Sequence, residues 1–460
     1  MTFPFDIATA TISVIGAARS GRAAVRLLRR NGAMVLLSDS TAAAANSDVR
    51  SEMEMLGAAV EFGGHSERVF DASLIVVSPG VPSDSPVLLG AAARGIPVIS
   101  EIELASMFCS APIVGITGTN GKTTTTTLTG EIFRAAGMRT LVAGNIGHAF
   151  CDALLEHNGE NDIAVVEVSS FQLDHCVRFR PDIAIVTTLT PDHLYRYGGR
   201  FENYVASKQR IFRMQFPEDA LIYNVDNPET VAASAPSVSR RYGSSVHQVL
   251  ERGGWMEARA LYLNLGDGPE SLASIDELHL RGRHNYMNIL MAALAARLRG
   301  VPVEVISGAV RAFEGVEHRL EFVRRLDDVM YINDSKATNV DSLLIALQSF
   351  HQSIVLIAGG RDKESPYDPL LPFIASKVRA AVLIGEAAGR MAEAFRGLTE
   401  VRHAAGMSDA VTEAQRLAHA GDIVLLSPAC ASFDMFDNFE HRGLVFKRLV
   451  QMLVPLGGTA

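Results

Sequence analysis

Short runs of β-branched and other apolar residues alternate along this chain with longer segments rich in Ala, Leu, Glu and Arg. The runs include ISVIG, IVGITG, IAVVEVSS, SIVLIAGG and DIVLLSPA. A parallel pair of strands needs a long crossover connection, which is usually a helix. The alternation therefore predicts an α/β fold in which parallel sheets are flanked by helices.

The strand and helix pattern restarts twice, after Ala111 and Pro112 and again after residues 315–319. Between residues 217 and 277 it is irregular and indicates no function. Because 460 residues exceed the size at which one hydrophobic core keeps growing, we expect three domains. We expect the first and third to be Rossmann-like and the second to carry a phosphate-binding loop. The predicted domains are residues 1–108, 109–314 and 315–460.

Charge and cysteine content narrow the partners and the compartment. The net charge is −9, whereas a non-specific nucleic-acid binder needs a basic face, so we expect no nucleic-acid partner. No basic residue precedes the first apolar run and no stretch approaches the length of a membrane span, which favours the cytoplasm. The cysteines are too few and too scattered for a zinc site or a disulfide framework, so we expect them reduced and mostly buried. They are Cys109, Cys151, Cys176 and Cys430.

The first strand, Ile12–Ile15, is followed by a glycine turn and a helical run over residues 22–30. Amides at a helix N-terminus attract anions, and a nucleotide diphosphate would fit this turn. The dinucleotide-binding fingerprint has a middle glycine at the position where this chain has Ala18. This difference weakens the alternative of a nicotinamide-dependent oxidoreductase. A second alternative is that Gly16 and Gly21 only let the helix pack on the strand. The candidate contacts of a nucleotide substrate are Gly16, Ala17, Ala18, Arg19, Ser20, Asp39, Ser40 and Ser78.

A phosphate loop follows the strand Ile113–Ile116 and leads into a helix. Lys122 can reach terminal phosphates and the Thr123 hydroxyl can ligate Mg²⁺. The loop is a variant, because Ile116 stands where the general pattern has its first glycine. A Gly-Lys-Thr between a buried strand and a helix is rarely structural only, so we predict that a nucleoside triphosphate binds. The candidate ATP contacts here are Gly118, Thr119, Asn120, Gly121, Lys122, Thr123 and Thr124.

Two further side chains are candidate metal ligands. Glu167 lies among β-branched residues of the next strand, where a carboxylate is costly without a cation. Beside a phosphate loop, Mg²⁺ is the natural cation. His193 follows another strand and alone would more often be a structural histidine. With Glu167 and Thr123 expected at the same sheet edge, we predict that His193 is also a ligand.

Four sequence blocks together resemble the Mur ligase family. They are GTNGKT at 118–123, EVSSFQL at 167–173, NDSKATN at 333–339 and SPACAS at 427–432, in family order over essentially the whole chain. The resemblance implies an ATP-dependent amide-bond ligase that adds D-glutamate to UDP-N-acetylmuramoyl-L-alanine through an acyl phosphate, in peptidoglycan precursor synthesis. It also implies two Mg²⁺ sites, and we expect a monomer.

The resemblance assigns roles to residues that the pattern alone leaves open. It implies that Lys208 is carbamylated and holds a second Mg²⁺; the alternative is a surface lysine on an amphipathic helix. It makes Asn145 a contact of the muramoyl substrate, against a turn asparagine with left-handed backbone. It makes Asn288 an adenine contact, against a helix cap. Tyr195 departs from the family, which usually has aspartate there.

In the third domain, the resemblance implies that Arg319 contacts the ATP γ-phosphate; the alternative is an interdomain ion pair. Asp334 is a further candidate ATP contact. Lysines and hydroxyls at helix N-termini are natural carboxylate receptors, and glutamate has two carboxylates. Because three domains contribute to one site, we predict a hinge motion of the third. The candidate glutamate contacts are Lys336, Thr338, Lys363, Ser432 and Phe439, and the candidate catalytic residues are Lys122, His193, Lys208 and Arg319.

Two other functions stay open for a chain of this kind. A sister ligase, such as a folylpolyglutamate synthase or another cell-wall ligase, would share the phosphate loop and the metal site. It would lack the blocks at 169–173 and 333–339. A nucleotide-binding regulator without ligase chemistry would need no amino-acid receptor.

Overall fold

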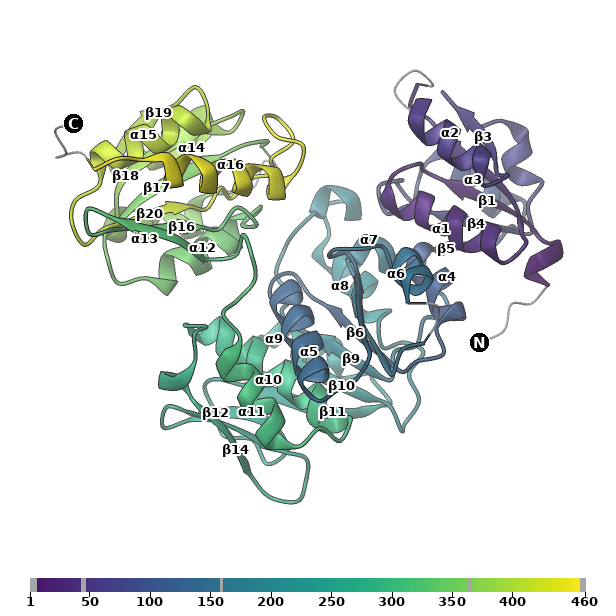
Figure 1. The fold of residues 1–460 in the computed structure, drawn as a ribbon, viewed down its shortest axis with the longest axis horizontal. Coiled ribbons are helices and arrows are strands. Elements are labelled where there is room, and N and C mark those ends of the chain that lie inside the picture. Colours follow the sequence, from purple (N-terminus) through teal and green to yellow (C-terminus); the bar gives the residue numbers. More distant parts are fainter. Residues whose placement is uncertain (1–5, 43–46, 158–159, 363–365, 456–460) are drawn as a thin grey trace. The chain divides into compact units, whose positions relative to one another are not determined.

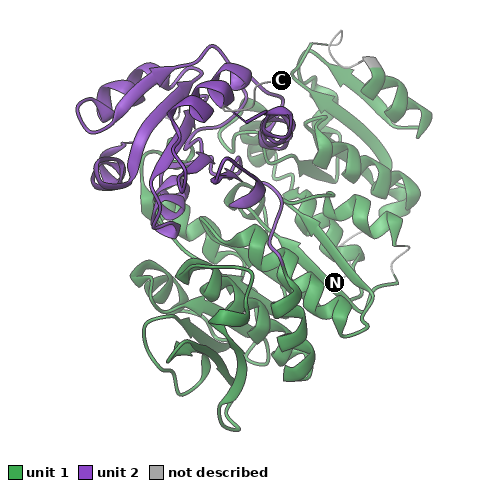
Figure 2. Cartoon of the chain, turned by 60° about the vertical axis from the view of Figure 1, so that its left-hand side comes forward, with its two compact units in different colours: residues 1–313 green, residues 314–460 purple. Residues whose placement is uncertain are grey.

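The computed structural model describes residues 6–42, 47–157, 160–362 and 366–455. The chain forms two compact units, residues Met1–Phe313 and Glu314–Ala460 (Figure 2). Unit 1 contains two sheets and unit 2 contains one (Figure 1). Within the described ranges, every helix is too short or too polar to cross a bilayer. All four cysteines are free, and all but Cys109 are buried.

The N-terminal sheet has the order β3-β2-β1-β4-β5, and all its neighbouring strands are parallel. The strand order reverses at β1, so the carboxyl end of β1 is where a ligand crevice is expected. Helix α1 begins at Arg19, three residues before the predicted start, because the backbone is extended only up to Ala18. The strands are β1 (Thr11–Ile15), β2 (Met34–Asp39), β3 (Ala59–Phe62), β4 (Leu74–Val77) and β5 (Val98–Ser100). The helices are α1 (Arg19–Arg30), α2 (Ser47–Met55), α3 (Pro86–Ala93) and α4 (Glu101–Phe108).

The central sheet has the order β14-β13-β12-β11-β10-β9-β6-β8-β7. Strands β6 to β12 pair in parallel, whereas β13 and β14 continue the sheet antiparallel. The irregular stretch 217–277 thus supplies β10 to β14. The strands are β6 (Ile113–Thr117), β7 (Thr140–Gly144), β8 (Ile163–Glu167), β9 (Ile183–Val186), β10 (Ala220–Asn224), β11 (Arg240–Ser245), β12 (Gly253–Glu257), β13 (Ala260–Asn264) and β14 (Glu270–Ser274).

Helices cover both faces of the central sheet. Helix α10 is buried without a break over residues 285–296, because apolar side chains and alanines surround its axis and it packs against α5. The helices are α5 (Lys122–Ala135), α6 (Phe150–Glu156), α7 (Ser170–Leu173), α8 (Phe201–Gln209), α9 (Pro228–Ser234), α10 (Arg283–Leu298) and α11 (Val303–Ala312).

The two sheets of unit 1 share one continuous core, in which α1 and α4 pack against α6. Polar contacts fasten the same junction. Arg26 donates to Asp152 at 2.9 Å, and the buried Glu103 carboxylate accepts the amides of Val177, Arg178 and Phe179. The first two domains therefore form one compact unit by contacts.

Unit 2 is a six-stranded sheet of order β15-β16-β20-β17-β18-β19, parallel except for the edge strand β15. Separate apolar clusters cover its two faces. The predicted α/β class with three domains is confirmed, and the exact limits 1–108, 109–314 and 315–460 stay a prediction. The strands are β15 (Glu321–Leu326), β16 (Val329–Asn333), β17 (Ile354–Gly359), β18 (Val378–Ile384), β19 (Glu400–His403) and β20 (Ile423–Leu426). The helices are α12 (Val340–Ser349), α13 (Leu371–Lys377), α14 (Ala388–Phe395), α15 (Met407–Leu417) and α16 (Phe439–Met452).

Candidate active site

The phosphate loop joins the end of β6 to the start of α5. Gly118 and Gly121 have φ angles of 148° and 87°, which side chains rarely adopt. A Cβ atom on Gly118 would overlap the Thr187 hydroxyl, and one on Gly121 would lie 2.5 Å from Asn288 Oδ1. Glycine is therefore required at both positions. Thr123, the predicted Mg²⁺ ligand, is buried in the first turn of α5.

The loop after β9 holds the phosphate loop in place. Lys122 Nζ donates to the carbonyl oxygens of Gly118 and Thr119, both at 2.9 Å, so the ammonium lies over its own loop. The Thr119 hydroxyl donates to the Thr190 carbonyl at 3.0 Å and lies 3.1 Å from the Tyr204 hydroxyl. The Asn120 carbonyl accepts from Thr187. The phosphate loop is thus preorganised by its own side chains and by the segment 187–190, which precedes His193.

Glu167 ends β8 and is 0% exposed. Asn145 Nδ2 donates to Glu167 Oε1 at 2.9 Å, and the Asn145 amide donates to the Glu167 carbonyl at 2.8 Å. The left-handed turn belongs to Gly144, with φ of 111°, so the interpretation of Asn145 as a left-handed turn residue is wrong. A buried carboxylate, a threonine hydroxyl and phosphate oxygens are the hard oxygen donors that Mg²⁺ prefers, and the residues present fit this ion.

Lys208 lies on α8 and is 2% exposed, so the alternative of a surface lysine is wrong. Its Nζ donates to the Gly118 carbonyl at 2.7 Å and lies 3.4 Å from Thr117 Oγ1. Burial, and after it the charge of Lys122, holds the Lys208 pKa well below its usual range. This shift favours the neutral amine, which is the form that reacts with carbon dioxide.

His193 has left-handed backbone, with φ of 54°, in the loop after β9. Its ring meets that of Phe171 edge-on, with 4.9 Å between centroids, and its Nε2 lies 3.7 Å from Asp192 Oδ2. Tyr195, the position that departs from the family, is 74% exposed. Its hydroxyl lies 3.4 Å from His193 Nδ1. The tyrosine thus lies beside the Nδ1 edge of the imidazole.

Asn288 lies in the second turn of α10 and is buried. The cap of that helix is Gly282, so the interpretation of Asn288 as a helix cap is wrong. Its Oδ1 accepts from Thr125 at 3.3 Å and its Nδ2 donates to Asn285 at 3.4 Å. The side chain therefore borders the phosphate loop, and the adenine contact stays a prediction.

A cavity of about 930 Å³ opens at the carboxyl end of β1. Ala17 is the one predicted nucleotide contact that does not line it; its amide donates to Asp39 Oδ2 at 2.6 Å. Burial opposes ionisation of Asp39, but the amides of Ala17 and Thr41 outweigh it and lower the Asp39 pKa. Gly21 also serves packing, because a Cβ there would overlap the Gly16 carbonyl. The predicted residues that line the cavity are Gly16, Ala18, Arg19, Ser20, Asp39, Ser40, Ser78 and Asn145.

Gln172, which the sequence prediction missed, also lines this cavity. Its Oε1 accepts the Ser169 amide and hydroxyl, both at 2.9 Å, in a capping box at the start of α7. Gln172 lies on α7 and Asn145 directly follows β7, so this cavity joins the glycine turn of β1 to the Glu167 edge of the central sheet. In the sequence, the block at 167–173 was the signal that could have pointed to Gln172.

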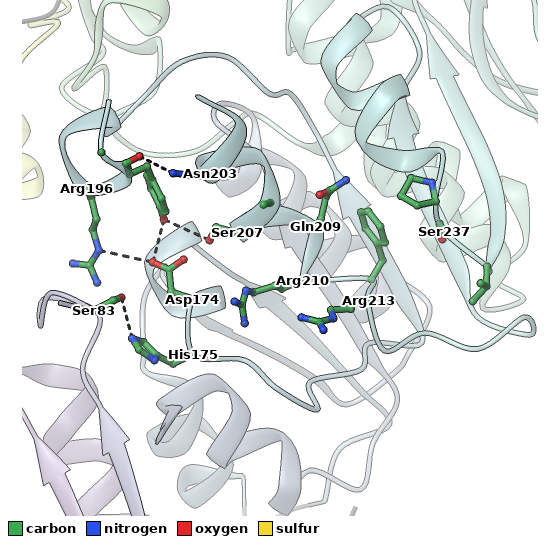
Figure 3. A pocket seen from close by; sticks show the side chains of 16 residues that line it. Ser83, Asp174, His175, Arg196, Asn203, Ser207, Gln209, Arg210, Arg213 and Ser237 are labelled. Carbon is green, nitrogen blue, oxygen red and sulfur yellow. Dashed lines mark hydrogen bonds and ion pairs between the residues drawn. The ribbon is translucent and has the colours of Figure 1, made fainter. Parts of the chain in front are cut away.

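A second cavity, of about 780 Å³, lies along α8 and is lined by none of the predicted site residues (Figure 3). Arg196, Arg210 and Arg213 line it, and Arg196 donates to the Val81 carbonyl at 2.9 Å. Its lining includes Ser207, the residue before Lys208, but not Lys208 itself. The required glycines and the buried titratable groups converge at the other cavity and the phosphate loop, so we place the candidate active site there.

In unit 2, Asp334, Lys336 and Thr338 follow β16, Ser432 lies in the loop after β20, Phe439 begins α16, and Arg319 precedes β15. Asp334 is buried and accepts from Ser427 at 2.8 Å and from the Leu320 amide at 3.2 Å. Burial, partly offset by Arg319, raises the Asp334 pKa to about 7. Lys336 Nζ lies 4.9 Å from the centre of the Phe439 ring. Thr338 is half-buried and Ser432 is buried, and Lys363 is outside the described residues.

The fold and the site define a class of protein. Family models match residues 10–100 (Mur ligase MurD-like, N-terminal domain), 116–296 (Mur ligase middle domain) and 318–430 (Mur ligase, glutamate ligase domain). This chain belongs to the Mur ligase family, whose members depend on ATP and generally use Mg²⁺. The predicted family membership is thus confirmed.

Two curated relatives share one name. The UDP-N-acetylmuramoylalanine--D-glutamate ligase of Salinibacter ruber is 46% identical over 98% of this chain and 100% of its own length. The ligase of the same name from Chloroherpeton thalassium is 47% identical over 96% of this chain and 98% of its own length.

Solved structures agree on the fold alone. A UDP-N-acetylmuramate-alanine ligase from Thermotoga maritima has a TM-score of 0.59 at 17% identity, over 96% of this chain and 99% of its own. MurF from Acinetobacter baumannii has a TM-score of 0.60 at 16% identity, over 96% and 93%.

Proposed function

We propose that this chain joins D-glutamate to UDP-N-acetylmuramoyl-L-alanine with conversion of ATP to ADP and phosphate, in the synthesis of peptidoglycan precursors. One observation carries the proposal: relatives named for this reaction match the chain over nearly its full length at 46% and 47% identity. The geometry at the phosphate-loop edge supports the same chemistry, because a triphosphate receptor, a buried carboxylate and a buried lysine meet there.

In the first step, the substrate carboxylate attacks the ATP γ-phosphate to give an acyl phosphate and ADP. Lys122 and Arg319 stabilise the charge that develops on the transferring group, each as a preorganised donor worth roughly 3–4 kcal/mol. Bound Mg²⁺ supplies further neutralisation of phosphate charge. Thr123 and Glu167 are the proposed ligands of one ion, and His193 and carbamylated Lys208 those of a second.

In the second step, the glutamate amine attacks the acyl carbonyl and a tetrahedral intermediate expels phosphate. We propose that the two glutamate carboxylates bind in unit 2. Their proposed receptors are Lys336, Thr338 and Ser432 at the strand ends, together with Phe439 and Lys363. A pair of carboxylate receptors favours glutamate over neutral amino acids. Asn339 caps α12 by accepting the Ser342 amide at 2.8 Å, which supports an ordered start of this receptor. We also propose that the enzyme is a cytoplasmic monomer.

The test is phosphate release from Mg·ATP with UDP-N-acetylmuramoyl-L-alanine and either D- or L-glutamate. Release that requires D-glutamate supports the proposal. Release with L-glutamate only would keep the two steps and change the acceptor. ATP binding without release in either case would favour the nucleotide-binding regulator, and release only with another acceptor would favour a sister ligase.

A further inference from the structure

Arg442 lies in the first turns of α16 and is 0% exposed, the largest fully buried side chain among the described residues. Burying a guanidinium is costly unless its donors are satisfied. Burial lowers the Arg442 pKa to about 10, so the side chain stays charged at neutral pH. The role of the buried Arg442 guanidinium therefore depends on the groups to which it donates.

The guanidinium donates to two loops at the carboxyl edge of the sheet. Nε donates to Ser335 Oγ at 3.0 Å and Nη2 donates to the Ser335 carbonyl at 2.7 Å. Nη1 donates to the carbonyls of Cys430 at 3.1 Å and Ala431 at 3.3 Å. All four acceptors therefore belong to the loops that follow β16 and β20.

A third loop closes on the same group. The Arg361 amide, after β17, donates to the Ala431 carbonyl at 2.9 Å. A Cβ atom on Gly360 would overlap that carbonyl and would lie 3.2 Å from Arg442 Nη1. Ser335 Oγ also donates to the Phe439 carbonyl at 2.8 Å. Loops from three strands and the start of α16 thus converge on one guanidinium.

We propose that Arg442 is a positioning residue for the amino-acid acceptor: it sets the spacing between the Lys336 loop and the Ser432 loop, which follow Ser335 and Ala431 directly. The inference rests on the proposed function, in which these loops receive the glutamate carboxylates. Only a planar guanidinium offers five donors in a fixed fork, so a lysine could hold one loop but not both.

The experiment compares Arg442→Lys with Arg448→Gln, which alters an exposed arginine of the same helix. We expect Arg442→Lys to raise KM for D-glutamate at least tenfold. KM for ATP and for the UDP substrate, whose proposed receptors lie mainly in unit 1, should stay within twofold. Arg448→Gln should change none of the three. Equal changes in all three constants, or lower thermal stability with no change in KM for glutamate, would overturn the proposal.

A milder variant covers the case in which Arg442→Lys does not fold. Ser335→Ala removes the Nε acceptor and the link to Phe439 but keeps the other three acceptors, so we expect a threefold to tenfold rise in KM for glutamate alone. No rise would contradict the proposal.

Hydrogen exchange separates failure of this inference from failure of the proposed function, because it needs no turnover. The amides of residues 335–338 and 430–434 should exchange at least tenfold faster in Ser335→Ala and Arg442→Lys than in Arg448→Gln. Unchanged exchange overturns the positioning role, whereas absence of glutamate-dependent phosphate release in the unaltered protein overturns the proposed function.

Discussion

Burial sets the chemistry of two charged side chains at the phosphate-loop edge. Glu167 is fully buried and accepts from Asn145, and Lys208 is buried with its Nζ on the Gly118 carbonyl. A buried carboxylate favours a nearby cation, and a buried amine loses its proton easily. A carbamate on Lys208 would turn this amine into a second oxygen ligand at the same edge.

The first prediction concerns Lys208→Arg. Because a guanidinium cannot form the carbamate, we expect phosphate release to fall at least a hundredfold. The matched control is Lys377→Arg, at a lysine that binds the carbonyls of Leu347 and Phe350 away from the site. Turnover of the unaltered protein should also fall when carbon dioxide is removed and return with bicarbonate. Full activity of Lys208→Arg would exclude the carbamate.

The second prediction concerns the pH dependence of stability. Glu101 is buried and accepts the Cys151 amide at 2.6 Å, and burial raises its pKa from 4.5 to about 7. A carboxyl whose folded pKa is raised favours the folded state at low pH. The contribution of Glu101 to the free energy of unfolding is fully present below pH 4.5 and is lost as the pH rises to about 7.

Glu101→Gln keeps the acceptor and cannot ionise, so it should remove this loss, on the order of a few kcal/mol. Urea unfolding at pH 5 and pH 7.5 measures it, with the exposed Glu202→Gln as the control. Equal pH dependence in Glu101→Gln and the unaltered protein would show that Glu101 is not the group responsible.

At the scale of elements, strand ends bring the site together. Parallel strands β6, β8 and β9 end at one edge, so the phosphate loop, Glu167 and the His193 loop meet although they are far apart in sequence. Helix α8 carries Lys208, whose Nζ donates to the Gly118 carbonyl of the phosphate loop. The order of the strands in the sheet, rather than any single motif, thus assembles the candidate metal site.

The third prediction concerns the strand-to-helix turn. Gly118→Ala puts a Cβ onto the Thr187 hydroxyl at φ of 148°, so we expect ATP binding to weaken at least tenfold and stability to fall by about 1–3 kcal/mol. Gly308→Ala, in α11 with no atom close to the new Cβ, should instead be neutral or stabilising. ATP titration and thermal unfolding measure both. Normal ATP affinity in Gly118→Ala would contradict this account of the loop.

At the scale of the whole molecule, the proposed reaction draws on both compact units. Lys122 belongs to unit 1, whereas Arg319 and the proposed glutamate receptors belong to unit 2. The reaction joins their substrates at one phosphoryl group, so both units must act on it together. The hinge motion of the third domain that we expect from the sequence stays a prediction.

The fourth prediction is that substrates change the arrangement of the two units. Small-angle scattering should give a smaller radius of gyration with a non-hydrolysable ATP analogue, Mg²⁺ and UDP-N-acetylmuramoyl-L-alanine than without them. Lys122→Ala, with its weakened nucleotide binding, should show a smaller change. An identical radius with and without the substrates would rule out closure by these ligands.

Local sequence was enough for the α/β class and the glycine turns. Short apolar runs indicate which segments are strands, and Gly118 and Gly121 indicate backbone angles that only glycine adopts easily, so these features can be predicted from neighbouring residues. The same reasoning located Glu167 on a buried strand.

Tertiary structure decided what the side chains face. The Ala17 amide binds Asp39, and Arg442 joins the loops after β16 and β20, neither of which a local pattern could indicate. Lys208 sits on a helix that the sequence alone left as a surface element, yet it is buried under the phosphate loop. Burial and hydrogen-bond partners depend on residues tens of positions away, and they set the charge state of a side chain. The sequence pattern therefore predicted the strands, the helices and the glycine turns. Packing between distant segments determined the burial, the hydrogen bonds and hence the chemistry of the side chains.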